Sequence, residues 1–594
     1  MVSRLWAMEK VRVEDFFMWQ DWAVIAGYLI LTTIVGHAMR GKQGTIKDFF
    51  LGGKSLPWQA VSGSIIATEI SGVTFIGVAG GLFAIHGDFT YLLWGIGSIM
   101  GRVIVAKWFV PRFYEEEIYS PYDYMGRRIG LGAKKLATVI FTIGSILGQS
   151  VRVFVAAIPL KVVTGMDIQY CIVIIGLFAI GWTLMGGMRT VIWTDVMQFV
   201  LFAFGGLLTL YWIISSMNGG WGEMWATAEN FGRNKTWDAR FGFGKELEFT
   251  LWVAILAVPF QNLTAFGVDQ LNAQRMFCCK DKKSAQKALV WSSVGQLMTL
   301  MMLLVGASLV VHYDKNPFTP KEGIVVMGID DKDDAVALQK AEKALADAPR
   351  IEHVDVVAAR AKFITANPDD PKATQFSDPQ ISSVAVVSKP DNVFPMWIVM
   401  VLPVGLSGLI LAGVFAAAIS SLDSILAALS QTTLSLFYDP ENKTEKELEE
   451  LDLMTKSRQL VVMWGVILTL FTIGLSEVAQ GIPVLPLAFG MTTYTMGPML
   501  AIFFCAMLGR GSVRGLLIGF IISFCIATFM RMDFWVLLKK SGISIDWLAR
   551  LPTYTMEGDS VTLIYLYAWL WPLTTIITFA CGVLIPKKEK KTLG

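Results

Sequence analysis

Six ionisable side chains interrupt long apolar segments of this 594-residue sequence. An ionisable group in such a segment costs about 3 kcal/mol, so each predicts either a functional site or a charge partner on a neighbouring helix. For Asp195, which follows Trp193 and Thr194, an acid in the first turn of a helix is an equally good interpretation. The six residues are Glu69, Arg102, Arg152, Asp195, Asp269 and Asp423.

Asp423 lies in a serine-rich segment of a helix expected over about 396–436, where Ala417, Ser420, Ser421 and Ser424 share one face. A dehydrated sodium ion needs about five or six oxygen ligands, which an apolar helix offers only as hydroxyls, carboxylates or carbonyls freed at a break. The serine face supplies hydroxyls, and an unwound turn over 67–70 would supply carbonyls. The alternative is that the small residues only allow close helix packing.

Arg152 needs an anionic partner, because a guanidinium in an apolar segment cannot be neutralised by deprotonation. The carboxylate of a bound solute would satisfy it. A structural ion pair with Glu69 or Asp269 is the equal alternative. Arg102 is expected instead to extend toward the cytoplasmic interface.

Membrane-spanning helices must position these residues. The chain is 54% hydrophobic and 16% charged, with a mean hydropathy of +0.55, which is too apolar for a soluble protein of this length. Apolar runs of about 20 residues recur along it, and only helices satisfy the backbone of such runs in lipid. The prediction is an all-α polytopic membrane protein with roughly 13 transmembrane helices.

The distribution of positive charge predicts the orientation. The net charge is +2 and the basic residues form no single patch, so no nucleic-acid partner is expected. Lysine and arginine gather in short loops that the positive-inside rule makes cytoplasmic, which puts the C-terminus inside and, for an odd number of spans, the N-terminus outside. These loops are 40–54, 107–135, 275–287, 443–458 and 587–591.

Two apolar segments carry polar residues and glycine in mid-span, which is typical of broken transporter helices. The first is 62–81, with Glu69 near its centre, and the second is 260–274, with Gly267 and Asp269. Four spans separate them, as a five-plus-five inverted repeat requires.

The domain boundaries follow from these breaks and from a change in composition. The segment 312–392 is rich in charge and proline and is expected to be an extracytoplasmic insertion. Its acidic cluster at 330–334 either binds a cation or begins a solvated helix. The expected parts are 1–40 (N-terminal segment and extra helix), 57–215 (first repeat), 247–311 with 393–508 (second repeat) and 512–594 (C-terminal helices and basic tail).

An enzyme is not expected. The four histidines are scattered, and no His/Glu pair has the spacing of metal ligands. No cofactor and no obligate protein partner are expected either. A transporter-like membrane sensor is the alternative from another class.

Five groups of residues, in this order and spacing, resemble the sodium/solute symporter family over most of the chain. They are 47–53 with 56–58, 67–77, 186–187 with 193–195, 269–270 with 274–275, and 417–424. The resemblance implies a LeuT-type five-plus-five inverted-repeat fold with an additional N-terminal helix, alternating access, and a coupling sodium between the first and eighth core helices.

The resemblance also implies ligands for that sodium. The carbonyls of Ala67, Ile70 and Ala417 and the hydroxyls of Ser420 and Ser421 would bind it. A second cation site of some members would here use Asp195, Ser420 and Ser424, with Asp423 where a hydroxyl is more usual. That extra carboxylate would strengthen cation binding or invite a proton.

The substrate residues implied by the resemblance argue against galactose, because its ligands are replaced by Thr74, Gly95, Asp269 and Gln296. Ser71 and Thr74 resemble the sialic acid branch of the family, which also has an arginine near Arg152 for the substrate carboxylate. Aromatic residues join them as candidates to line or gate a cavity, although such residues in spans more often pack or face lipid. The expected substrate residues are Ser71, Thr74, Trp94, Ser98, Arg152, Asp269, Gln296 and Phe489.

The sequence therefore predicts a sodium-coupled secondary symporter in a plasma or bacterial inner membrane, whose partners are a small solute, sodium and the lipid bilayer. A sugar acid or sialic-acid-like carboxylate is the leading solute. A neutral sugar or polyol is the alternative.

Overall fold

The computed structural model describes most of the helical part of the chain. The described residues are 17–39, 51–84, 87–116, 118, 120–185, 188–315, 390–438, 453–479, 482–545, 547, 554–557, 560–563 and 565–586. The 330–334 cluster, most of the expected insertion, the Gly186-Gly187 pair and the basic C-terminal tail lie outside these residues.

Up to twelve segments of the described chain are long and apolar enough to cross a membrane, and a shorter apolar helix is a thirteenth apolar segment, against roughly 13 spans expected from the sequence. Nine are continuous or nearly so: α2 (Trp19–Met39), α6 with its flanking turns (Phe89–Glu115), α9 (Leu131–Thr164), α11 (Met188–Ser215), α16–α17 (Lys282–His312), α22 (Leu406–Tyr438), α24 (Leu453–Ala479), α25–α26 (Val484–Met507) and α29 with its preceding turn (Tyr567–Leu584). Three are bent pairs: α4 (Trp58–Glu69) with η3–α5 (Val73–Phe83), α13–α14 (Leu251–Gly267) with α15 (Gln270–Phe277), and α27 (Val513–Phe529) with α28 (Met532–Lys540). The shorter apolar helix α10 (Ile168–Met185) is the thirteenth.

The first bent pair breaks beside Glu69, where the sequence places a carboxylate before Ser71 and Gly72. Helix α4 ends at Glu69 because Ile70 adopts an extended conformation, with φ −79° and ψ 95°, and the chain resumes as η3 (Val73–Val78) and α5 (Ala79–Phe83) at 56° to α4. The last carbonyls of a helix have no partner within it. The break thus leaves the carbonyls of 67–70 available to other groups.

The second bent pair breaks at Asp269. Helix α14 (Val258–Gly267) ends at Gly267, and α15 begins at Gln270 at an angle of 52°. The carboxylate of Asp269 caps α15 by accepting a hydrogen bond of 2.8 Å from the backbone N–H of Leu271.

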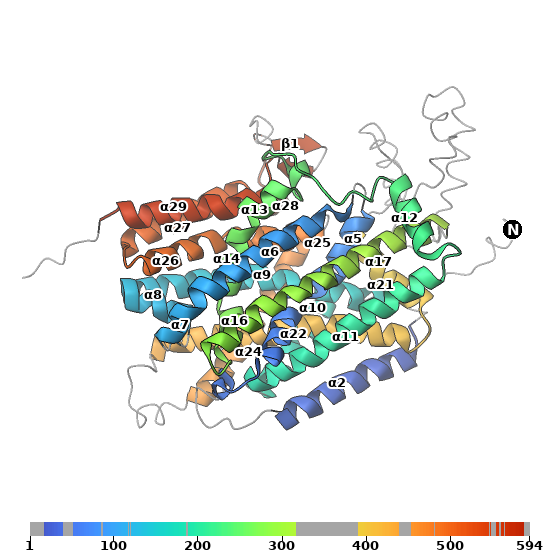
Figure 1. Ribbon diagram of the computed structural model, residues 1–594, viewed down its shortest axis with the longest axis horizontal. Coiled ribbons are helices and arrows are strands. Elements are labelled where there is room, and N and C mark those ends of the chain that lie inside the picture. Colours follow the sequence, from blue (N-terminus) through green and yellow to red (C-terminus); the bar gives the residue numbers. More distant parts are fainter. Residues whose placement is uncertain are drawn as a thin grey trace, which may run out of the picture.

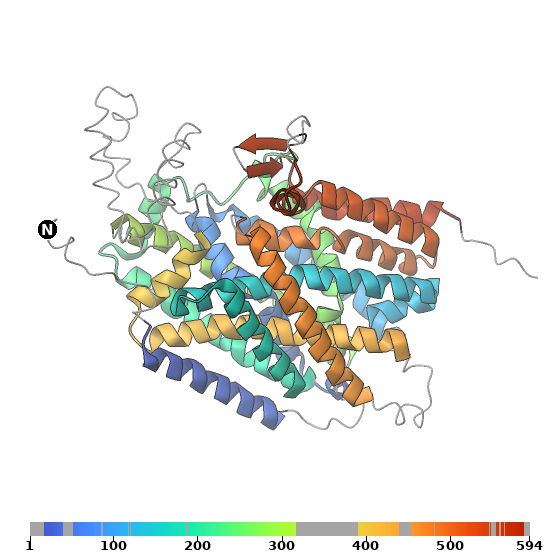
Figure 2. The same ribbon diagram turned by 180° about the vertical axis from the view of Figure 1, so that it is seen from behind.

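The spans form a thick bundle with α22 inside it and α2 at one edge (Figures 1 and 2). In the most apolar stretch of α22, 94% of residues are buried, against 17% for α2. Helices α26 (Met496–Met507), α27 and α29 (Leu570–Leu584) pack together at the opposite edge (Figure 1). The serine-rich face of α22 therefore lies where only other helices can reach it.

Two glycines of α6 (Leu92–Ile104) allow this helix to touch α13 (Leu251–Leu256) and α14 closely. A Cβ atom at Gly97 would lie 2.1 Å from the Ala254 carbonyl oxygen, and one at Gly101 would lie 2.6 Å from the Asn262 Cβ. This approach brings Ser98 within hydrogen-bonding distance of Asn262.

Two expectations about secondary structure are wrong. The helix expected over about 396–436 is two helices, α21 (Pro390–Val401) and α22, because Pro403 and Gly405, with φ +86°, separate them. Residues 554–563, assigned to the all-helical C-terminal part, contain the antiparallel strands β1 (Tyr554–Glu557) and β2 (Ser560–Leu563). The described chain also contains the shorter helices α8 (Pro121–Ile129) and α12 (Gly220–Asn230), and α7 (Val110–Glu115) forms the end of the Phe89–Glu115 span.

Candidate functional site

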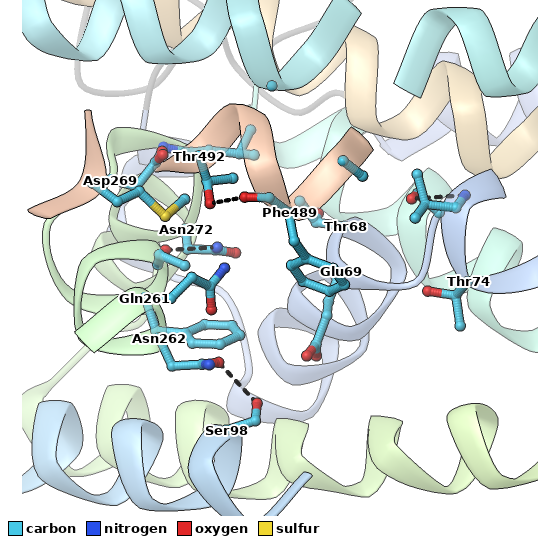
Figure 3. Close-up of a pocket in the computed structure, with 18 of the residues that line it drawn as sticks. Thr68, Glu69, Thr74, Ser98, Gln261, Asn262, Asp269, Asn272, Phe489 and Thr492 are labelled. Carbon is cyan, nitrogen blue, oxygen red and sulfur yellow. Dashed lines mark hydrogen bonds between the residues drawn. The ribbon is translucent and has the colours of Figure 1, made fainter. Parts of the chain in front are cut away.

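A cavity of about 190 Å³ lies between the two broken helices, with α6, α9, α17 (Gln296–Lys315) and α25 (Val484–Thr492) completing its wall. Figure 3 shows Asp269 across this cavity from the hydrogen-bonded side chains of Ser98 and Asn262. The volume suits a small organic molecule. All eight substrate residues expected from the sequence line it, namely Ser71, Thr74, Trp94, Ser98, Arg152, Asp269, Gln296 and Phe489.

Glu69 and Arg102 form an ion pair at the edge of the cavity. The Arg102 side chain is fully buried, with its guanidinium carbon 4.3 Å from the centre of the Phe266 ring, whereas the Glu69 side chain is 26% exposed. The expectation that Arg102 extends to the cytoplasmic interface is wrong, because α6 turns it inward onto the carboxylate at the end of α4.

Arg152 makes no ion pair within 4.0 Å with either acid proposed as its structural partner, because Glu69 pairs with Arg102 and Asp269 caps α15. Its Nη1 atom donates to the carbonyl oxygen of Thr68 at 2.8 Å and to the Ser421 hydroxyl at 3.2 Å. The interpretation that Arg152 forms a structural ion pair with Glu69 or Asp269 is therefore wrong.

Polar groups beyond the expected set also line the cavity. Ser145, Gln149 and Arg152 follow one another at helical spacing on α9 and form a polar stripe. The Ser145 hydroxyl, the Gln149 Oε1 atom and the Asn272 Oδ1 atom are buried and have no hydrogen-bond partner among the described residues. The spacing of the stripe could have identified Ser145 and Gln149, whereas no sequence signal marks Asn272.

Aromatic rings lie together on one side of the cavity. The rings of Trp94 and Phe489 meet edge to face at 5.0 Å between centroids, and Tyr91 packs against both. Trp94 donates from Nε1 to the Glu248 carbonyl oxygen at 2.9 Å. The Glu248 carboxylate accepts a hydrogen bond from Tyr567, and burial raises the pKa of this carboxyl group to about 7.

The expected sodium residues lie on two adjoining elements. Ala67 and Ile70 are at the break after α4, and Ala417, Ser420 and Ser421 are on α22, which packs against α4. Ser420 donates its hydroxyl hydrogen to Asp195, and Ser421 accepts from Arg152. Helices α4 and α22 are thus in contact, and Arg152 touches both Thr68 of α4 and Ser421 of α22.

Asp195 is joined to an arginine at the expected second cation site. It lies inside α11, fully buried, so the interpretation as an acid of the first helical turn is wrong. Its Oδ2 atom accepts from Arg275 Nη2 at 3.0 Å, and the same nitrogen donates to Ser424. Arg275 was expected in a cytoplasmic basic loop, which is wrong, because α15 buries it.

Asp423 lies beside this pair without a full set of partners. Its Oδ1 atom accepts from the Ser424 hydroxyl at 3.1 Å, while the buried Oδ2 atom has no hydrogen-bond partner among the described residues. The carboxyl groups of Asp195 and Asp423 therefore lie near a single arginine, Arg275.

A family model described as the sodium:solute symporter family matches residues 49–331 and 362–522. Among curated relatives, the sodium/sialic acid symporter SiaT of Proteus mirabilis is 24% identical over 459 residues, 77% of this chain and 78% of the relative. Sodium-coupled monocarboxylate transporter 2 of Bos taurus is 25% identical over 87% of this chain and 73% of the relative. The sodium/glucose cotransporter of Vibrio parahaemolyticus is 28% identical over 70% and 68%.

A solved structure of a Na⁺-coupled sialic acid symporter in a substrate-bound, outward-open state has the same fold. It aligns with a TM-score of 0.69 at 21% identity, over 96% of this chain and 98% of that one. The fold is of the LeuT type, and the relatives are transporters and not enzymes. The chain therefore belongs to the sodium:solute symporter family and is a multi-pass, sodium-coupled solute symporter of the membrane.

Proposed function

We propose that the transported solute is a small carboxylate that also carries hydroxyl groups, a sugar acid or a sialic-acid-like molecule. One observation carries this proposal. Arg152 faces the cavity, and among the described residues it donates only to the neutral acceptors Thr68 and Ser421 and has no carboxylate partner within 4.0 Å, so its positive charge is not paired there. A carboxylate is the anion that a guanidinium binds best, through two parallel hydrogen bonds.

The other polar groups of the cavity favour a polyhydroxylated solute over a simple monocarboxylate. The Gln149 and Asn272 carbonyl oxygens have no donor among the residues described, and a buried acceptor of this kind costs about 1–3 kcal/mol until it is paired. Hydroxyl groups of a solute would donate to them. A short monocarboxylate without hydroxyl groups offers no such donors.

The coupling sodium is proposed to bind at the carbonyls of Ala67, Ile70 and Ala417 and the hydroxyls of Ser420 and Ser421. Sodium there joins α4 to α22 beside the cavity, so it stabilises the state in which the solute site is formed. Each ligand then raises the affinity for the other by the same factor. Asp423 and Ser424, next to the Asp195–Arg275 pair, are proposed as a second cation site.

A neutral sugar or polyol is the alternative solute, since the same acceptors would bind its hydroxyls. Uptake into proteoliposomes with an imposed sodium gradient, compared among sialic acids, uronates, monocarboxylates and neutral sugars, decides between them. We expect sialic acids or uronates to be taken up and Arg152→Ala to weaken their uptake selectively. Equal weakening of neutral and anionic solutes would refute the carboxylate role.

The proposed topology has the N-terminus outside and the C-terminus in the cytoplasm of a plasma or bacterial inner membrane. Helix α2 begins at the end of the molecule opposite to the one where α29 ends (Figure 1), which agrees with an odd number of spans. Labelling of single cysteines placed in the N-terminal and C-terminal segments by a membrane-impermeant reagent tests it.

A further inference from the structure

Arg152 bridges the same two elements that the proposed sodium site joins. Its Nη1 atom reaches the Thr68 carbonyl oxygen, in the last turn of α4, at 2.8 Å, and the Ser421 hydroxyl of α22 at 3.2 Å. Thr68 lies between Ala67 and Ile70, whose carbonyls are proposed sodium ligands, and Ser421 is itself one. A fixed cation of the protein therefore lies at the ion site.

A sodium ion and the Arg152 guanidinium cannot both bind the Ser421 oxygen strongly, because both are positively charged. A sodium ion within bonding distance of this hydroxyl would lie only a few ångströms from the guanidinium, in surroundings too apolar to screen the repulsion. Sodium binding at Ser421 thus favours a position of Arg152 farther from α22.

The Arg152 side chain can turn away from α22 toward the cavity. Arg152 lines it, and two acids attract the guanidinium toward that side, Asp269 most strongly and then Glu69. Among the three arginines around the site, Arg102 is held by Glu69 and Arg275 by Asp195, while Arg152 has only neutral acceptors within the part of the chain that the structure describes. It is the one whose present contacts are weakest.

We propose that Arg152 couples the two ligands, because its guanidinium competes with sodium at Ser421 and is released by sodium to bind the solute in the cavity. This inference rests on the proposed function. It makes Arg152 a positioning residue for sodium binding as well as a ligand of the solute. Its two roles predict opposite effects of the same substitution.

Equilibrium binding of radioactive sodium to the purified full-length protein in lipid nanodiscs, without solute, tests the competition. We expect Arg152→Gln and Arg152→Met to bind sodium at least threefold more tightly than the wild type, because both remove the competing charge. Arg152→Lys keeps a charge and should stay within twofold of the wild type. Lys135→Gln, which removes an exposed charge from the same helix, is the matched control and should change nothing.

The second measurement adds the transported solute. In the wild type it should tighten sodium binding, and in Arg152→Gln this effect should disappear. Unchanged or weaker sodium binding in both neutral variants would overturn the inference, as would an equal gain in Arg152→Lys. Failure of the wild type to take up any carboxylate would instead refute the proposed solute, and the comparison without solute would still stand.

Discussion

The Arg102 guanidinium lies against the Glu69 carboxylate at the point where α4 breaks. The pair links two helices that line the cavity, and Gln296 of α17 donates to the other carboxylate oxygen at 3.2 Å. The negative charge of the Glu69 carboxylate is therefore compensated by Arg102. An anionic solute can therefore approach Arg152 without facing an uncompensated acid at this position.

The pair predicts an asymmetric response to substitution. Glu69→Gln leaves a fully buried guanidinium without its carboxylate, which should cost about 3–5 kcal/mol of stability. Arg102→Gln leaves a carboxylate that is 26% exposed and should cost clearly less. Thermal unfolding in detergent measures the order, and the double variant should resemble Arg102→Gln. A larger loss in Arg102→Gln than in Glu69→Gln would contradict the burial that the structure assigns.

The sodium site predicts a strong effect of the two serines of α22. Ser420→Ala/Ser421→Ala removes two oxygen ligands, and the sodium concentration for half-maximal uptake should rise at least about 100-fold, because each contact with a charge is worth roughly 1.5–3 kcal/mol and about 1.4 kcal/mol is a factor of ten. Sodium-dependent uptake into proteoliposomes measures it. Ser430→Ala is the matched control, because Ser430 is buried on the same helix and donates to its own Leu426 carbonyl. Unchanged sodium dependence in the double variant would remove Ser420 and Ser421 from the site.

Much of the architecture could be predicted because breaks in membrane helices leave local marks. Glycine and an acid in mid-span indicated two of the three bent pairs, those at Glu69 and Asp269, within a residue or two of where the helices end. The partners of charged groups could not be predicted in the same way. Arg102 and Arg275 are paired with acids from other helices, and only the tertiary structure, which brings Arg102 to Glu69 and Arg275 to Asp195, decides that they point inward.

Substitution of Asp423 should change the number of cations that are coupled to each transported solute. A buried carboxylate with one unpartnered oxygen needs a cation or a proton. We expect Asp423→Asn to lower the number of coupled cations per solute by one, while the sodium site at Ser420 and Ser421 continues to drive uptake. Solute accumulation at equilibrium, measured against imposed sodium gradients and then against imposed proton gradients, gives the number and identifies the second cation.

Ser424→Ala keeps the acid and is the control for Asp423→Asn. It removes the hydroxyl that donates to Asp423 and accepts from Arg275. It should weaken affinity without changing the number of cations. The same stoichiometry in Asp423→Asn and wild type would make this carboxyl group a structural one.

Glu248 predicts a pH dependence of stability. Burial raises the pKa of this carboxyl group to about 7 in the folded protein, above its ordinary value near 4.5. A raised pKa means that the folded state favours the protonated form, so this contribution to stability is complete below about pH 4.5 and is lost as the pH rises through 7.

Glu248→Gln keeps an acceptor for the Tyr567 hydroxyl but does not ionise, so it avoids this loss of stability. Thermal unfolding should show the variant about 1–3 kcal/mol more stable than the wild type at pH 8, with the difference shrinking toward pH 5. Glu246→Gln, at an exposed position two residues away, is the control and should show no such trend. A constant difference between Glu248→Gln and the wild type from pH 5 to pH 8 would mean that Glu248 does not titrate in this range.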